Sequence, residues 1–156
     1  MISTAALQSK ASRQWGKWLG SRNWHLRITM TFSPSKLSTV SHELALGRAR
    51  DGMNWLGGHI HSPIAWIAFT EFTARGHAHV HIDARFTDDR RPSSDQMRNW
   101  ERWLRRRNGF VRVQDYVKGL GGARYDSKYA GSSETQWDCS NAFLKLMRNQ
   151  GGGLRS

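Results

Sequence analysis

Apolar and polar residues alternate strictly from Trp24 to Phe32. Every even-numbered residue in this range is apolar, and every odd-numbered residue is polar. Side chains on a β-strand point alternately to its two faces, so the pattern predicts a half-buried strand with Trp24 and Leu26 on the same face. The segment Ser33-Pro34-Ser35 is expected to end this strand.

Two further runs, Ile64–Phe72 and His77–Phe86, are rich in apolar residues. The segment between them has the length of a hairpin loop and ends in Gly76, so the two runs predict a β-hairpin. On the second strand His77, His79 and His81 would share one face, with the imidazoles roughly 7 Å apart along the strand.

Helical spacing of apolar residues predicts two helices. The first runs from Ser38 to Trp55, with Ser38 or Ser41 as its cap, and Gly57-Gly58 closes it. The segment His59-Ile60-His61 that follows is expected to be a loop.

The second helix is expected from Asp95 to Arg107, with Ser93 or Ser94 as its cap, and the strand Phe110–Gln114 follows it.

Three other segments complete the expected organisation. Ala5–Leu19 predicts a basic helix, and Ala123–Ala130 predicts a helix that ends at Gly131. Trp137–Met147 is consistent with either a strand or a helix. We expect a basic N-terminal helix over residues 1–22, one folded domain over residues 23–148 and a flexible tail over residues 149–156.

The order strand, helix, hairpin, helix, strand is typical of an α+β domain. We expect an antiparallel sheet with helices on one face, of the ferredoxin-like or RRM-like kind. The other face of such a sheet is open to a substrate.

Charge indicates the class of partner. The chain has 24 lysines and arginines against 12 acidic residues, a net charge of +12, which favours binding to a nucleic acid. Its single cysteine, Cys139, excludes an internal disulfide and fits a reducing compartment. Without a long apolar run we expect no membrane span, and a cytoplasmic location.

Three residues of the hairpin form a candidate metal site. If the two strands pair, Glu71 lies across from His79 and His81, and two imidazoles and one carboxylate suit a divalent cation. His77 is an alternative ligand or a supporting residue. A closed structural zinc site is the other reading, although such sites usually use several cysteines.

The histidines and a tyrosine pair together resemble the HUH endonucleases of the rolling-circle replication initiator (Rep) type. His79-Val80-His81, with Glu71 upstream, resembles the His-hydrophobic-His motif, and the strand over residues 28–32 is similar to the motif that precedes it. Tyr125-Asp126-Ser127-Lys128-Tyr129 is similar to the Tyr-x-x-Lys-Tyr motif of two-tyrosine phage and plasmid initiators. The resemblance covers roughly residues 24–131. The lysine often found three residues after the second tyrosine is replaced by Ser132, which leaves the role of Tyr129 open.

The resemblance implies a function. A tyrosine, Tyr125 or Tyr129 with Lys128 beside it, would nick single-stranded DNA and form a 5′-phosphotyrosine link. A divalent ion, Mn²⁺ or Mg²⁺ with Zn²⁺ as a possible occupant, would bind to Glu71, His79 and His81. The activity would initiate rolling-circle replication of a phage or plasmid from single-stranded or hairpin origin DNA. The protein would act as a monomer in the host cytoplasm, with a host helicase and polymerase.

Seven arginines are candidate DNA contacts: Arg27, Arg75, Arg98, Arg102, Arg105, Arg106 and Arg124. The first alternative function is a non-catalytic module that binds single-stranded nucleic acid through exposed aromatics and arginines. The second is a relaxase or transposase of the same superfamily. It fits less well, because no histidine follows His81 and the tyrosine helix lacks the expected Gln.

Overall fold

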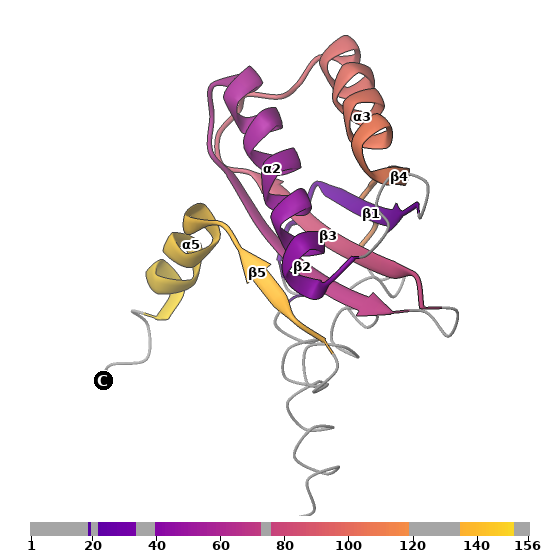
Figure 1. Cartoon of the computed structure of the whole chain (residues 1–156). Coiled ribbons are helices and arrows are strands. Elements are labelled where there is room, and N and C mark those ends of the chain that lie inside the picture. The colour runs from indigo at the N-terminus through magenta and orange to yellow at the C-terminus, as the bar shows by residue number, and fades with distance from the viewer. Residues whose placement is uncertain (1–18, 20–21, 34–39, 73–75, 119–134, 152–156) are drawn as a thin grey trace, which may run out of the picture.

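The computed structural model describes residues 19, 22–33, 40–72, 76–118 and 135–151 (Figure 1). This part of the chain is an α+β arrangement of five strands and three helices. In chain order the elements are β1 (Leu26–Phe32), α2 (His42–Ile60), β2 (Ile64–Phe72), β3 (Ala78–Phe86), α3 (Ser94–Asn108), β4 (Gly109–Asp115), β5 (Trp137–Cys139) and α5 (Asn141–Gly151).

The strands form one sheet in the order β4-β1-β3-β2-β5, and every neighbouring pair is antiparallel. The predicted hairpin is confirmed, since β2 has the predicted bounds and pairs along its whole length with β3. The strand β3 begins at Ala78, so His77 precedes it. The centre of the sheet is therefore the strand that carries His79 and His81.

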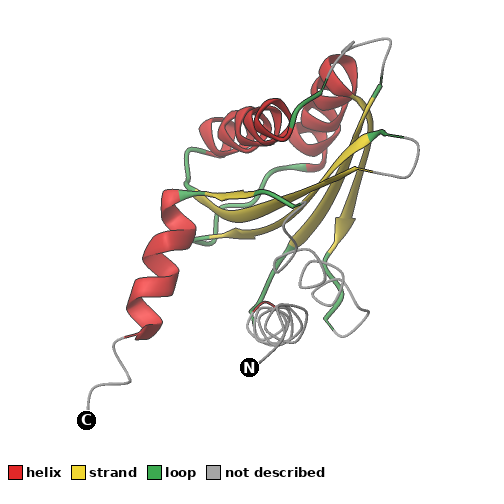
Figure 2. Cartoon of the chain, turned by 60° about the horizontal axis from the view of Figure 1, so that its bottom comes forward, coloured by secondary structure: helices red, strands yellow, loops and turns green. Residues whose placement is uncertain are grey.

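One face of the sheet carries the main core. The alternation in β1 is confirmed from Leu26 onward, and the side chains of Ile28 and Met30 are fully buried on this face. Figure 2 shows α2 and α3 together on the same side of the sheet. They cover it with a cluster that includes Met53 of α2 and Trp100 and Leu104 of α3. No helix in the described ranges is long and apolar enough to cross a membrane.

The opposite face is partly covered as well, which corrects two predictions. Phe143 of α5 packs there with Trp24 and with Ile67 and Phe69 of β2, so the helices do not all lie on one face. Trp24 does not share a face with Leu26. The strand β1 begins only at Leu26, so the side chains before it do not follow the strand's alternation between the two faces. The continuous apolar sequence of β2 reflects burial on both faces.

The end of α2 also differs from the prediction. Ser41 caps its start, as one of the two expected caps, but the helix continues through Gly57-Gly58 to Ile60. His61 then adopts a left-handed conformation, and its backbone N–H donates to the carbonyls of Gly57 and Gly58. A Cβ on Gly57 would lie 3.1 Å from the carbonyl oxygen of Ser62, so this glycine permits the close turn that ends the helix.

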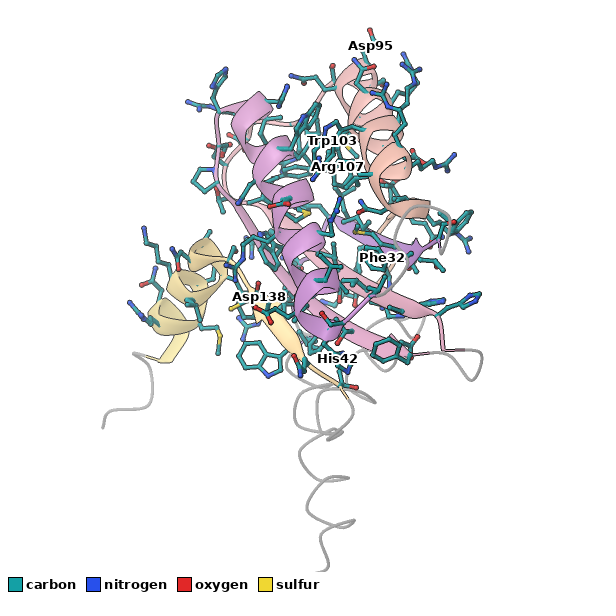
Figure 3. All side chains as sticks on the ribbon, in the orientation of Figure 1. Phe32, His42, Asp95, Trp103, Arg107 and Asp138 are labelled. Carbon is teal, nitrogen blue, oxygen red and sulfur yellow. The ribbon has the colours of Figure 1, made fainter. Side chains whose placement is uncertain are left out.

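The helix α3 follows its predicted pattern closely. Ser93 is its cap, and the Gln96 side chain completes a capping box. The indole Nε1 of Trp100 donates to the Gly52 carbonyl of α2 at 2.8 Å, which fixes one helix against the other. Figure 3 shows Trp103 and Arg107 on the side of α3 that faces α2, and the Arg107 guanidinium lies 4.8 Å from the Trp103 ring centroid.

The C-terminal region, which the sequence left open, contains both a strand and a helix. Ser140 separates β5 from α5, and its hydroxyl accepts hydrogen bonds from the backbone N–H groups of Trp66 and Phe143. The helix continues to Gly151, so it includes the first residues of the tail expected from residue 149. The helices expected over Ala5–Leu19 and Ala123–Ala130 lie outside the described residues, apart from Leu19.

Candidate metal centre

The candidate metal ligands lie on the sheet face opposite α2 and α3, which we call the histidine face. It is formed by the odd-numbered residues of β1, β2 and β3 and by the even-numbered residues of β4. Alternation places Ala78, Val80 and Ile82 in the main core and turns His79 and His81 to the histidine face. The burial of three residues on one face thus fixes the direction of two imidazoles on the other.

The hairpin brings the predicted carboxylate to the histidines. Glu71 is paired with His79 across β2 and β3. The Nε2 atom of His81 and the Oε1 atom of Glu71 are 3.0 Å apart, and one ligand atom from each of Glu71, His79 and His81 lies within 4.8 Å of the others. These three residues therefore form a cluster that could hold a metal ion.

Thr29 holds the buried histidine of this cluster. His81 is 7% exposed, and its Nδ1 atom lies 3.3 Å from the hydroxyl oxygen of Thr29 on β1. If Nε2 binds a metal, Nδ1 carries the proton and donates it to this hydroxyl. The sequence analysis treated Thr29 as an ordinary sheet residue. Its position on the polar face of β1 was the available signal, but its partner depends on the pairing of β1 with β3.

The electrostatics of the cluster favour a neutral imidazole at His79. Burial is the largest cause that lowers the pKa of His79, and the neighbouring imidazole of His81 lowers it further, whereas Glu71 raises it. A lowered pKa leaves the ring nitrogen unprotonated at more acidic pH. This is the form that binds a metal.

The residues present fit a divalent cation. Two imidazoles and a carboxylate are the donor set of many transition-metal sites and leave further coordination positions for water or substrate oxygens. Adjacent ligands of an octahedral ion with bonds of about 2.1 Å lie about 3 Å apart. The 3.0 Å between His81 Nε2 and Glu71 Oε1 matches that spacing.

The other histidines considered from the sequence are not among the three residues of the cluster. His77 is exposed and precedes β3, and it is not among the grouped ligand residues in the described part of the chain. His59 belongs to the last turn of α2 and His61 is its C-cap, so this pair lies partly on a helix rather than in the expected loop. Cavities of about 670 and 770 Å³ beside α2 are lined by residues outside the cluster.

The candidate DNA-binding arginines fall into separate groups. Four of them lie on α3, in the helical layer across the sheet from the metal cluster: Arg98, Arg102, Arg105 and Arg106. Arg27 is on the histidine face, but its side chain is 14% exposed, and its guanidinium pairs with the Asp83 carboxylate at 3.1 Å. Because the Arg27 side chain is largely buried and already pairs with Asp83, little of its surface is available to contact a phosphate.

The predicted tyrosine motif lies outside the described residues. This applies to Tyr125, Lys128 and Tyr129, and also to Arg75 and Arg124. The geometry of the candidate site is therefore that of the metal cluster and the surrounding sheet. Comparison of the chain with models of protein families, with curated proteins and with solved structures gives no match.

Proposed function

We propose that the protein is an HUH endonuclease that nicks and rejoins single-stranded DNA. The observation that carries the proposal is the cluster of Glu71, His79 and His81 on the central strands of an antiparallel sheet. The order of the motifs, the Tyr125–Tyr129 segment and the net charge of +12 support it.

A phosphodiester repels an anionic nucleophile, so the site must offset negative charge. A divalent ion held by Glu71, His79 and His81 would supply positive charge beside a nonbridging oxygen of the scissile phosphate. Thr29 would keep His81 in the tautomer that presents Nε2. Mn²⁺ and Mg²⁺ are the proposed working ions, and Zn²⁺ also suits the two imidazoles.

The proposed nucleophile is the phenolic oxygen of Tyr125 or Tyr129. A tyrosine has an ordinary pKa of about 10, and a nearby cation such as Lys128 favours its ionised form. The tyrosine oxygen forms a bond to phosphorus, and the bond to the 3′ oxygen breaks. The proton lost by the tyrosine balances the proton gained by the new 3′-hydroxyl.

The products fit the start of rolling-circle replication. The free 3′-hydroxyl can prime a polymerase, and the 5′-phosphotyrosine link retains the bond for later rejoining. In this proposal a phage or plasmid origin is the substrate, host enzymes unwind and copy the DNA, and the protein acts as a monomer in the host cytoplasm.

A second candidate function is a module that binds single-stranded nucleic acid without cleavage. The exposure of Phe110 on the sheet surface favours it, because exposed aromatics on a sheet are a common platform for unpaired bases. This function requires neither a metal nor a tyrosine nucleophile.

The two functions are separated by an assay for a covalent adduct. The protein is mixed with a pool of labelled single-stranded DNA and Mn²⁺ and analysed on a denaturing gel. The proposal predicts an adduct that EDTA abolishes and that His79→Ala, His81→Ala and Glu71→Gln abolish or strongly reduce. His59→Ala is the matched control, since this exposed histidine lies on α2 outside the cluster.

Two results would contradict the nicking proposal. One is tight DNA binding without an adduct on any sequence in the pool. The other is an adduct that forms equally well in the cluster variants. Calorimetric titration of the same variants with Mn²⁺ gives a readout that does not depend on activity.

A further inference from the structure

The solvent side of α3 carries four exposed arginines, which we call the arginine face: Arg98, Arg102, Arg105 and Arg106. Arg102 lies three or four residues from each of the other three, which is the spacing of neighbours on a helix surface. Trp100 and Leu104 are fully buried in the main core on the other side of α3. Their burial fixes the direction of the arginine face toward solvent.

Positive charge on the arginine face is not balanced by nearby carboxylates. Arg102 and Arg106 make no hydrogen bond or ion pair with another residue in the described ranges. Arg98 pairs with Asp95, but the two side chains are 65% and 81% exposed, and an ion pair this exposed contributes little. A surface hollow of about 460 Å³ is lined by the four arginines and Glu101. An anionic ligand in this hollow would meet four guanidinium groups and one carboxylate.

The guanidinium of Arg105 is held in place at the end of α3. Its Nε and one terminal nitrogen donate to the carbonyl of Val111 on β4 at 3.2 and 3.0 Å, and the same terminal nitrogen donates to Glu101 at 2.7 Å. The side chain is still 53% exposed. The face therefore includes one positive charge whose position is already fixed before a ligand binds.

The composition of this helix surface suits a duplex rather than a single strand. The exposed residues of α3 are all polar or charged, so the helix offers no exposed aromatic ring on which an unpaired base could stack. A duplex keeps its bases paired inside and presents its phosphates, which guanidinium groups bind well. The face extends over about 12 Å of helix, and the same length of duplex axis carries about seven phosphate charges.

The arginine face and the metal cluster lie on different sides of the sheet. The helix α3 covers the main core, whereas Glu71, His79 and His81 belong to the histidine face (Figure 2). A duplex bound to α3 would therefore leave the metal cluster accessible to another part of the DNA.

We propose that the arginine face binds double-stranded DNA through its phosphate backbone, at a site separate from the metal cluster. Under the proposed function this duplex is the paired DNA that adjoins the strand to be nicked. The choice of DNA over RNA rests on the proposed function, whereas the preference for a duplex rests on the chemistry of the face.

The salt dependence of binding measures the number of phosphate contacts. Each lost contact lowers the slope of log K against log salt concentration by about 0.9. The glutamine variant combines Arg98→Gln, Arg102→Gln and Arg106→Gln, so its slope should be lower by about 2.7. Between 50 and 200 mM salt the parent should then lose about 40-fold more affinity than the variant. Glutamine has nearly the helix propensity of arginine, and Arg105 is kept because it contacts Val111.

The test measures equilibrium binding of a fluorescently labelled DNA duplex at several salt concentrations in EDTA, so that neither metal binding nor cleavage contributes. The control variant combines Lys118→Gln, Lys145→Gln and Arg148→Gln, which removes the same charge from exposed positions outside α3. A lysine variant, with lysine at the three positions of the glutamine variant, keeps the charge and should keep the slope of the parent. Thermal unfolding of each variant checks that the fold is intact.

The duplex proposal is supported if the glutamine variant shows the smaller slope while the control and lysine variants bind as the parent does. It is overturned if the glutamine variant keeps the slope of the parent, if the control variant loses as much, or if the loss is confined to single-stranded DNA or to an RNA duplex. An adduct formed by the parent, with duplex binding unchanged in the glutamine variant, would overturn the duplex site alone. Loss of duplex binding in that variant, without any adduct from the parent, would overturn nicking alone.

Discussion

Replacing Thr29 by valine is expected to weaken metal binding without unfolding the protein. Valine has nearly the shape of threonine but lacks the hydroxyl, whose oxygen lies 3.3 Å from Nδ1 of His81. Without metal, Nε2 of His81 can donate to Glu71 at 3.0 Å, and Nδ1 needs no proton acceptor. With metal on Nε2, Nδ1 must carry the proton, and the variant removes the hydroxyl of Thr29 that would accept it.

The magnitude follows from that difference. Loss of the hydrogen bond that orients a ligating histidine typically lowers metal affinity about 10- to 100-fold, which corresponds to about 1.4–2.8 kcal/mol. We therefore expect Thr29→Val to bind Mn²⁺ about 10- to 100-fold more weakly.

Thr31→Val is the matched control. Thr31 lies on the same strand and face and is paired with His79, but its hydroxyl has no hydrogen bond to another residue in the described ranges. Calorimetric titration with Mn²⁺ should show affinity within about 2-fold of the parent for this control. Equal affinities for Thr29→Val and the parent, or equal losses for the two variants, would refute the argument.

Three further predictions concern stability and pH. Gly109→Ala should destabilise the fold by about 1–3 kcal/mol in urea denaturation, because Gly109 has φ of 125° and a Cβ there would lie 2.7 Å from the backbone nitrogen of Ser33. Leu104→Ala should cost about 2–5 kcal/mol in the same assay, since Leu104 is 1% exposed in the main core. His25 accepts the backbone N–H of Phe86 at 3.0 Å, and burial, followed by two nearby arginines, lowers its pKa. As the pH falls, the His25 imidazole is therefore protonated at a higher pH in the unfolded chain than in the folded protein. The free energy of unfolding should decrease as the pH drops below about 6.5, and His25→Asn should remove that part of the pH dependence.

The strands near the site could be predicted from the sequence because their signals are local. The strand β1 shows its own alternation of apolar and polar residues. The two arms of the hairpin are joined by a short connection, which places Glu71 opposite His79, so no distant contact has to be known. The partner of Thr29 could not be predicted in the same way. Its approach to His81 requires the non-local pairing of β1 with β3.

The prediction for the end of α2 was wrong because local propensity was weighed without tertiary contacts. A glycine in a helix costs about 1 kcal/mol relative to alanine, which makes Gly57-Gly58 look like a stop signal. In the structure, burial of Leu56 and Ile60 in the main core offsets that cost, and the missing Cβ of Gly57 accommodates Ser62.

The prediction that helices cover only one face was wrong for a similar reason. The continuous apolar sequence of β2 does not by itself say what covers each of its two faces. Whether Ile67 and Phe69 have a partner depends on α5, a segment whose structure the sequence left undecided. The short strand β5 and the turn at Ser140 bring Phe143 to that face.

The central claim is that this cluster supports a tyrosine nucleophile on DNA. Its most direct test is mass spectrometry of the peptides formed when the protein is incubated with single-stranded DNA and Mn²⁺ and then digested. The account predicts a nucleotide linked to Tyr125 or Tyr129, present with the parent protein and absent with EDTA or with His81→Ala. DNA binding without any linked tyrosine peptide, or a linked peptide that persists in His81→Ala, would contradict it.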